Sequence, residues 1–516
     1  ARSQIVARLT ESMAARIAHT LVKKSIEAAN EALTRFLSEA KEPTVVEPGA
    51  DPIPLLPDTY SIDFTGGRLY LQAWTRDRTL TRRITQLLDT KLGVIEFAVE
   101  RFGKRTGTLQ LYDASHPVAA NLTRKASRQT YREQFRRSLL RQFPGWRIAE
   151  LSSEADLEHS LSPAYPRALL QKGSATQAAI GCSPDAQDVD GVLTFGLIWL
   201  DYLRARETKR KVLGLSVFVP EGRQRTTCLR LLYLDPCQGE WSVFVFTDRI
   251  EDKVDLQDYG NIETTLPTLG AQSGSELTAW MEKLSSYPHV SSRDERGGRI
   301  SWTVRGLEFA RWEPGTGLHF GIETKRRATE SNVPEIEGLA RELVRLRSPD
   351  SVDRANPLYL KKPELWLEAQ VSACLRDVDA SLDATPAYRQ APAFAGGERS
   401  ILDLLAVDYA GRLAVVEVKV TEDLHLPLQA LDYWIRVYWH ARHNDFSRAG
   451  YFPGKQLQTL PPRLLLIAPA LHFHPTTDSL TSYFSPAIEV DIAGVAMDWR
   501  EQIKVMFRRT HAPRPS

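Results

Sequence analysis

Three charged residues stand inside two apolar, strand-like segments in the last quarter of the chain. Asp403 lies within residues 401–407, and Glu417 and Lys419 lie within residues 413–420. Burying a charge without a partner is costly, so such positions are typical of an ion pair, a metal site or a reaction that uses the charge. The alternation of a strand puts Glu417 and Lys419 on one face. These segments therefore constrain both the fold and the chemistry of the region.

The composition is that of a globular protein with several domains. A chain of 516 residues exceeds one hydrophobic core and predicts about three domains. With 42% hydrophobic and 25% charged residues, bulk disorder is not expected. The 66 basic and 64 acidic residues nearly cancel, so the distribution of charge is more informative than the net charge of +2. The sequence has no apolar run of ~20 residues and no signal-peptide pattern, so no membrane association is expected.

The four cysteines are scattered and form no Cys-x-x-Cys pair. This argues against a structural zinc site, an iron–sulfur cluster and a disulfide-stapled secreted fold, and it favours a reduced, cytoplasmic setting. The cysteines are Cys182, Cys228, Cys237 and Cys374.

Periodicity and breaker residues predict a mixed helical and strand domain at 1–150, an α+β middle domain at 151–325 and a polar linker at 326–356. No repeat of fixed period is apparent in the middle domain. The helices expected in the first domain are 3–40, 80–101 and 122–143, and the strands are 67–74, 107–112 and 146–151. In the middle domain the clearest strands are 213–219, 228–234, 241–246 and 300–304.

Residues 357–510 alternate strand-like and helix-like segments, which predicts an α/β sheet covered on both faces. A turn at 409–412 returns the chain so that Asp403 and Glu417 meet at one end of the sheet. The other elements expected here are helices at 363–375, 426–442 and near 479–484, and strands at 463–468 and near 487–490.

Two carboxylates at one end of a sheet form an oxygen site suited to Mg²⁺ or Mn²⁺. Such a cation keeps several waters and takes further ligands from substrate phosphate. It lowers the pKa of a bound water and stabilises the oxyanions of an in-line displacement. Lys419 beside the carboxylates would hold a water or hydroxide and offset charge on phosphorus. This is the arrangement that a metal-dependent phosphodiesterase requires.

Asp403 followed by Glu417-Val-Lys419 resembles the PD-(D/E)xK nuclease superfamily. The preceding helix carries Glu368, similar to the first-helix glutamate that many members use as an additional ligand. The resemblance covers about 360–495 and implies a restriction-endonuclease-like mixed sheet flanked by helices. It also implies that Asp403, Glu417 and Glu368 are metal ligands and that Lys419 is the catalytic lysine.

The following helix carries Gln429-Ala-Leu-Asp-Tyr433, which is similar to the Gln-x-x-x-Tyr motif of the RecB-like branch. The resemblance implies that Gln429 and Tyr433 lie near the active site and DNA. The sequence departs from the family because Leu402, rather than the common proline, precedes Asp403. The cysteines of iron–sulfur members are missing, and no Gly-x-x-x-x-Gly-Lys-Ser/Thr motif is present, so neither that cluster nor an ATP site is expected.

Each motif taken alone also fits a structural role. Glu417 and Lys419 could form a pair on an exposed edge strand, and Asp403 could be a satisfied buried carboxylate. Glu368 could belong to a solvated helix face, and the Gln-x-x-x-Tyr pair could cover a surface. The order and spacing of the four pieces in one α-β-β-α frame favours the site.

A second signal is a stripe of arginines at every fourth position of the helix expected at 122–143. Like charges at this spacing destabilise an isolated helix, so contact with nucleic-acid phosphates is expected. Tyr131, Phe135 and Trp146 could stack on bases. The alternative is a solvated helix whose arginines pair with acidic groups elsewhere. The stripe consists of Arg124, Arg128, Arg132 and Arg136.

The sequence thus predicts a metal-dependent nuclease, with DNA expected because the resembling family mostly cuts DNA. Residues 1–325 would bind or select the substrate. One alternative is a catalytically silent or partner-dependent DNA-binding subunit of a bacterial defence or DNA-repair complex. Another is an enzyme acting on a different phosphoester. The expected partners are DNA and proteins of such a system, and the chain could also assemble with copies of itself.

Overall fold

The structure is a computed structural model of a mixed α/β chain with several sheets. Its contacts divide the chain into two compact units, Ala1–Ser174 with Ala179–Gln187, and Ala175–Ala178 with Asp188–Ser516. It describes residues 25–511 except 48–51, 76–78, 92, 102–104, 116, 184–185, 187, 247–250, 258–263, 265, 267–274, 296–297, 385–386 and 396–397. Of the helix expected at 3–40, residues 25–39 are helical and 3–24 lie outside the described residues.

The first unit contains a seven-stranded antiparallel sheet in the order β2-β1-β7-β6-β5-β4-β3. Helix 25–39 buries Ile26 and Leu33 against one face of it. The helix expected at 80–101 is wrong, because this segment forms two strands, and in the second of them the alternate residues Ile95, Phe97 and Val99 are buried. The strands are β1 (Pro43–Val46), β2 (Ile53–Pro54), β3 (Tyr60–Thr65), β4 (Arg68–Trp74), β5 (Thr79–Lys91), β6 (Val94–Arg101) and β7 (Arg105–Asp113).

The arginine-rich helix is α2 (Pro117–Gln142), which confirms the expected helix. Its apolar side is fixed by Tyr131 and Phe135, which are 4% and 1% exposed. A Cβ added to Gly181 would lie 2.8 Å from the Tyr131 hydroxyl, so the helix packs closely here. Stacking of Tyr131 and Phe135 on nucleic-acid bases is therefore wrong. Trp146 is half-buried and packs edge-on against Phe143.

A six-stranded sheet follows in the order β13-β12-β11-β10-β9-β8. The strand expected at 228–234 is wrong, since 225–231 is helical and buries Cys228 and Leu231 one turn apart; a short apolar run fits either period. The elements are β8 (Arg147–Ser152), β9 (Arg167–Lys172), β10 (Ala175–Gly181), α3 (Val192–Arg206), β11 (Lys211–Pro220), α4 (Arg225–Leu231), β12 (Glu240–Phe246) and β13 (Glu251–Lys253).

A smaller five-stranded antiparallel sheet comes next. The segment expected to be a linker at 326–356 instead contains a helix, and its Ile336, Ala340 and Leu343 are buried in the core of this sheet with Trp302 and Phe309. The elements are α5 (Ser275–Ser285), β14 (Val290–Glu295), β15 (Arg299–Val304), β16 (Leu307–Glu313), β17 (Gly317–Phe320), β18 (Arg326–Arg327), α6 (Val333–Leu346) and α7 (Pro357–Leu360).

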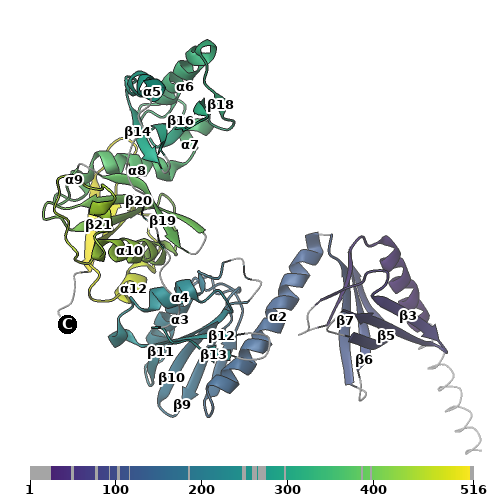
Figure 1. Ribbon diagram of the computed structural model, residues 1–516. Helices are drawn as coiled ribbons and strands as arrows, with labels where there is room; N and C mark the ends of the chain where they lie inside the picture. Colours follow the sequence, from purple (N-terminus) through teal and green to yellow (C-terminus); the bar gives the residue numbers. More distant parts are fainter. Residues whose placement is uncertain are drawn as a thin grey trace, which may run out of the picture. The chain divides into compact units, whose positions relative to one another are not determined.

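The last sheet is mixed, with the order β19-β20-β21-β22-β23-β24 and helices packed on it (Figure 1). The strands holding Asp403 and Glu417 and the helix at 426–442 are confirmed. Of the described helices, none is long and apolar enough to cross a membrane. The elements are α8 (Pro363–Ala373), α9 (Leu375–Val378), β19 (Tyr388–Ala395), β20 (Glu398–Val407), β21 (Leu413–Val418), α10 (Leu426–Arg442), α11 (Asp445–Arg448), β22 (Arg463–Pro469), α12 (Thr477–Ser482), β23 (Val490–Val495) and β24 (Val505–His511).

Candidate active site

Strands β20 and β21 bring Asp403 and Glu417 together. Their antiparallel register pairs Leu404 with Val416, so the next position along places Asp403 opposite Glu417 on the same face. The backbone N–H of Val418 donates to Oδ2 of Asp403 at 2.8 Å. The tight turn between these two strands therefore sets the carboxylates side by side, as the sequence predicts.

Glu417 is deeply buried, with 2% exposure. Its Oε1 lies 3.6 Å from Nζ of Lys419, while its Oε2 has no hydrogen-bond partner among the described residues. Burial, with Asp403 adding repulsion, raises the pKa of Glu417 well above its usual value. This burial excludes the exposed edge-strand pair, and it leaves one carboxylate oxygen available for a ligand.

Asp403 is destabilised as an anion in the same way. Burial raises the pKa of Asp403 to about 7, with the nearby charges of Glu368 and Glu364 adding to the shift. The hydrogen bond from Val418 and the charge of Lys419 oppose it. The ionised form of a half-buried carboxylate with one hydrogen bond and anionic neighbours is strongly favoured by an added cation.

Lys419 is the cation that the described structure places beside the carboxylates. It follows β21, and its backbone N–H donates to the carbonyl of Ile467 at 2.9 Å, which extends the sheet by one residue. Burial lowers the pKa of Lys419, but Glu417, Glu364, Asp403 and Asp423 together outweigh it and raise that pKa. The ammonium group is thus held charged at the edge of the site.

Glu368 lies on α8 and is 1% exposed, so the solvated helix face considered for it is wrong. Its Oε1 accepts a hydrogen bond from Nε of Arg389 at 2.9 Å. Its charge reaches Asp403, because it contributes to the raised pKa of that residue. Glu364, one turn earlier on α8, acts on Asp403, Glu417 and Lys419 alike. The four-residue spacing of the two glutamates is the signal that could have assigned Glu364 to the site.

Gln429 and Tyr433 lie one turn apart on α10, which packs against β21 and β22 (Figure 1). Both are half-buried. Burial raises the pKa of Tyr433, and Glu417 and Asp403 raise it further. The phenol therefore lies within electrostatic reach of the two carboxylates, which is the neighbourhood that the sequence motif implies.

The carboxylates fit a divalent cation that completes its coordination from outside the protein. In the part of the chain that the structure describes, no three His, Cys, Asp or Glu side chains are grouped to hold a metal by themselves. Asp403 and Glu417 offer two carboxylates with raised pKa values and one oxygen without a hydrogen bond. A hard cation with water and phosphate as further ligands suits this set.

A cleft of about 650 Å³ adjoins this region on the side of Arg389. It lies between α8 and β19 on one side and β14 of the five-stranded sheet on the other. Arginines from both sides line it, namely Arg293, Arg305 and Arg389. Glu501 is the acidic residue that lines it among those described, so the lining is basic.

The arginine stripe on α2 is only partly available for an external anion. Arg128 is exposed, whereas Arg136 donates to Glu133 at 2.9 Å and Arg132 lies 4.0 Å from the same carboxylate. The side chain of Arg124 lies outside the described residues. Local pairing therefore accounts for part of the stripe, and Arg128 stays a candidate for phosphate contact.

No known protein-family model matches the chain, and no curated protein matches it either.

Proposed function

We propose that the carboxyl-terminal α/β domain is a metal-dependent nuclease of the PD-(D/E)xK type that hydrolyses phosphodiester bonds, with DNA as the expected substrate. The observation that carries the proposal is the convergence of Asp403, Glu417 and Lys419 in a buried site. Ion pairing with one lysine does not satisfy the buried Glu417 and the half-buried Asp403 together. A cation that binds there and a reaction that uses it explain why the charges are buried.

The order of elements supports the same reading. A helix, an antiparallel run of three strands, a second helix and a parallel strand correspond to α8, β19 to β21, α10 and β22. This is the arrangement expected of a restriction-endonuclease-like sheet. Asp403, Glu417 and Lys419 then take the positions of the two ligands and the lysine.

In hydrolysis, a water attacks phosphorus, the bond to the leaving oxygen breaks, and that oxygen takes up a proton. Asp403 and Glu417 would hold the cation, which lowers the pKa of a bound water and stabilises negative charge on the phosphate. Lys419 keeps its proton and stabilises charge on the attacking water or on a phosphate oxygen. Glu368, held by Arg389, and Glu364 set the negative potential around the site and serve as auxiliary ligand candidates.

Gln429 and Tyr433 would support the substrate from α10, and the basic cleft beside Arg389 would receive its phosphates. A silent or partner-dependent DNA-binding subunit is the second candidate. The raised pKa values of Asp403 and Glu417 favour the active enzyme, because a binding-only domain has no need to bury these charges.

The test is incubation of the purified chain with linear and circular, single- and double-stranded DNA and with RNA, with Mg²⁺ or with a chelator. Wild type is expected to cleave at least one of these only when metal is present, and Asp403→Ala and Lys419→Ala are expected to lose cleavage. Equal cleavage by all three proteins would contradict the site. Cleavage that appears only after a partner protein is added would favour the subunit.

A further inference from the structure

The middle six-stranded sheet and the carboxyl-terminal sheet have the same order of elements along the chain. Apart from helical segments of three or four residues (Pro236–Gln238, α9 and α11), each begins with a helix and three strands, followed by a helix, a strand, a short helix and two further strands. In both sheets the strands lie side by side in chain order. The matching elements are α2, β8, β9, β10, α3, β11, α4, β12 and β13 in the first, and α8, β19, β20, β21, α10, β22, α12, β23 and β24 in the second.

The strand directions also match wherever both pairings are described. The first pair of each sheet, β8 with β9 and β19 with β20, is antiparallel. The pairs β11 with β12 and β22 with β23 are parallel. The last pairs, β12 with β13 and β23 with β24, are antiparallel again. Two mixed sheets that agree in strand order and in the direction of these three pairs share one topology.

A short sequence match lies at equivalent points of the two copies. Tyr233-Leu-Asp-Pro236 leads from α4 to β12, and Tyr483-Phe-Ser-Pro486 leads from α12 to β23. The two tyrosines are 250 residues apart (483 against 233), and so are the first residues of the two strands (490 against 240). The copies therefore align without a gap over this connection.

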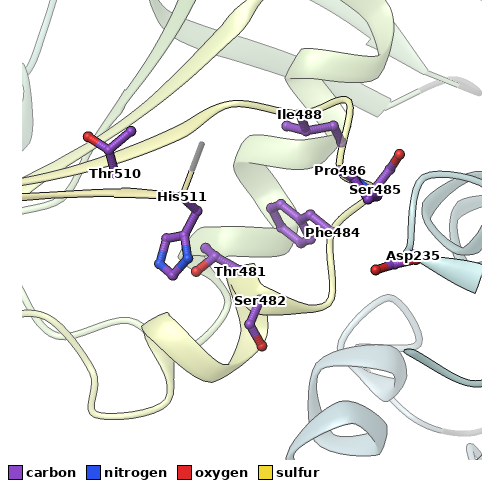
Figure 2. A pocket seen from close by; sticks show the side chains of 9 residues that line it. All are labelled: Asp235, Thr481, Ser482, Phe484, Ser485, Pro486, Ile488, Thr510 and His511. Atoms are coloured by element: carbon purple, nitrogen blue, oxygen red, sulfur yellow. The ribbon is translucent and has the colours of Figure 1, made fainter. Parts of the chain in front are cut away.

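These two connections bind each other reciprocally. Leu234 and Phe484 form an antiparallel bridge. The N–H of Asp235 donates to the carbonyl of Tyr483 at 2.8 Å, and the N–H of Ser485 donates to the carbonyl of Tyr233 at 2.7 Å. Exchanging the two copies turns one hydrogen bond into the other, which is the signature of an isologous, two-fold contact. Figure 2 shows Asp235 facing the segment that holds Ser485, beside a cavity of about 260 Å³.

The helices on either side of this bridge also make reciprocal contacts between the two copies. Helix α4 of the middle copy packs on α10, and α12 of the carboxyl-terminal copy packs on α3 (Figure 1). Arg230 of α4 donates from Nε and Nη2 to the carboxylate of Asp432 on α10, at 2.9 and 2.7 Å. Arg230 is 4% exposed, so this bidentate pair is part of the interior of the contact.

The middle copy has lost the chemistry of the site. Neither β9 nor β10, which correspond to the strands of Asp403 and Glu417, contains an aspartate or glutamate. The helices that follow β10 and β21, namely α3 and α10, meet at their amino-terminal ends. There the ring of His425, which precedes α10, lies 3.1 Å from the hydroxyl of Thr194 in the first turn of α3.

We propose that α2 to β13, residues 117–253, are a second copy of the candidate catalytic fold without acidic residues in β9 and β10, paired with the active copy about a pseudo-two-fold axis within one chain. The chain then presents one cutting site and one non-cutting partner site to the same nucleic acid, and it cuts one strand of a duplex per encounter. The part of the proposal that concerns cleavage, the cutting half, rests on the proposed nuclease function. The part that concerns the pairing of the two copies rests only on the contacts described above.

The pairing is tested by a charge exchange. Arg230→Asp and Asp432→Arg are each expected to lower the unfolding temperature, and the double variant is expected to recover part of the loss. The control is the same exchange at Arg326 and Glu335, an ion pair with both side chains more than half exposed, which is expected to change little. If the unfolding temperature of the double variant falls by the full sum of the two single decreases, the pairing is overturned.

A disulfide gives a second measurement that does not depend on the charge variants. Directly paired residues of an antiparallel bridge are close enough for a disulfide, so Leu234→Cys with Phe484→Cys, in a Cys237→Ser background, is expected to cross-link on mild oxidation. The product runs faster than the reduced chain on a denaturing gel. Each single cysteine variant serves as the control. A double variant that stays reduced would also overturn the pairing.

The cutting half is tested with supercoiled circular DNA and Mg²⁺, at protein concentrations below that of DNA. One cutting site per chain is expected to give nicked circles first, and linear DNA only later as separate nicks accumulate. Linear DNA that appears together with the first nicked circles would overturn the single-strand proposal. If no DNA is cut under any condition, the proposed function fails, and the disulfide and charge exchange still decide the pairing.

Discussion

The backbone N–H of Val418 donates to Oδ2 of Asp403 at 2.8 Å, which joins the two strands of the candidate site at the point where their charges meet. This bond leaves Asp403 with a fixed orientation beside Glu417. It satisfies only one of the four carboxylate oxygens, and Oε2 of Glu417 keeps no partner among the described residues. The fold therefore holds two carboxyl groups together where their ionised forms are unfavourable, and the first two predictions below follow from that cost.

The first prediction concerns pH and stability without metal. The pKa of Asp403 is raised to about 7 from 3.8, so the folded state binds an extra proton between these values. The contribution of Asp403 to the unfolding free energy of the protein therefore falls as pH rises from about 4 to about 7, and then levels off. In the presence of a chelator, Asp403→Asn is expected to be more stable than wild type at pH 8, by up to about 4 kcal/mol, and close to it at pH 4.

Denaturant unfolding of both proteins across this pH range measures the difference. Glu342→Gln, a change at an exposed position of α6, is the control and is expected to show no such trend. A difference between Asp403→Asn and wild type that does not change with pH would show that Asp403 is not held protonated by its surroundings.

The second prediction concerns metal binding. Mg²⁺ or Mn²⁺ is expected to raise the unfolding temperature of wild type, because a ligand that binds only the folded state stabilises it by mass action. Glu417→Gln is expected to lose most of this increase, and wild type is expected to lose much of it at pH 6, where protons compete for Asp403. Thermal unfolding with and without metal measures both effects. An unchanged increase in Glu417→Gln would place the metal elsewhere.

The third prediction concerns the attachment of the five-stranded sheet beside α8. Arg347 is fully buried and donates from Nη1 to the carbonyls of Leu358 and Lys361 at 2.8 and 2.7 Å, and from Nη2 to that of Arg305 at 3.0 Å. Arg347→Met leaves these carbonyls unpaired and is expected to cost about 3 kcal/mol. Arg345→Met, at an exposed position in the last turn of α6 and two residues before Arg347, is the matched control. Similar unfolding midpoints for the two variants would contradict the role of Arg347.

The fourth prediction concerns the basic helix α2. Replacing Arg128 and Arg132 by glutamate is expected to weaken nucleic-acid binding and to reduce the salt dependence of the binding constant, by a slope of about 2 if both contact phosphate. Arg341→Glu with Arg345→Glu makes the same change of charge on α6 and is expected to matter less. Titrations at several salt concentrations measure the slopes. If the two pairs of substitutions have equal effects on binding, α2 has a structural role and does not contact nucleic acid.

The sequence predicted the site better than the rest of the fold, for physical reasons. Asp403 and Glu417 interrupt long apolar runs, so the sequence showed both the strands and the charges within them. The hydrophobic pattern at 426–442 likewise gave the correct bounds of α10. Edge strands such as β24 carry polar residues on both faces and gave no signal. The strands at 79–101 were missed because their buried residues also fit a helical period.

The second copy of the fold was not predicted because the two strands that correspond to those of Asp403 and Glu417 lack carboxylates. Strands β9 and β10 contain no acidic residue, so nothing there matched the pattern of Asp403 and Glu417. The one sequence signal was the pair of Tyr-x-x-Pro connections at Tyr233 and Tyr483, and four residues are too short a match to indicate a repeat. Only the order of strands and the reciprocal hydrogen bonds made it visible.

The measurement that tests the central claim most directly is the cleavage rate constant under single-turnover conditions with Mg²⁺, for wild type and Glu417→Gln, with DNA affinity measured in parallel in a chelator. Glu417→Gln preserves shape and removes the charge. The account predicts a cleavage rate lower by at least about 100-fold, about 3 kcal/mol in the barrier, with unchanged metal-free affinity. A variant that cleaves at the wild-type rate would contradict the assignment of the site.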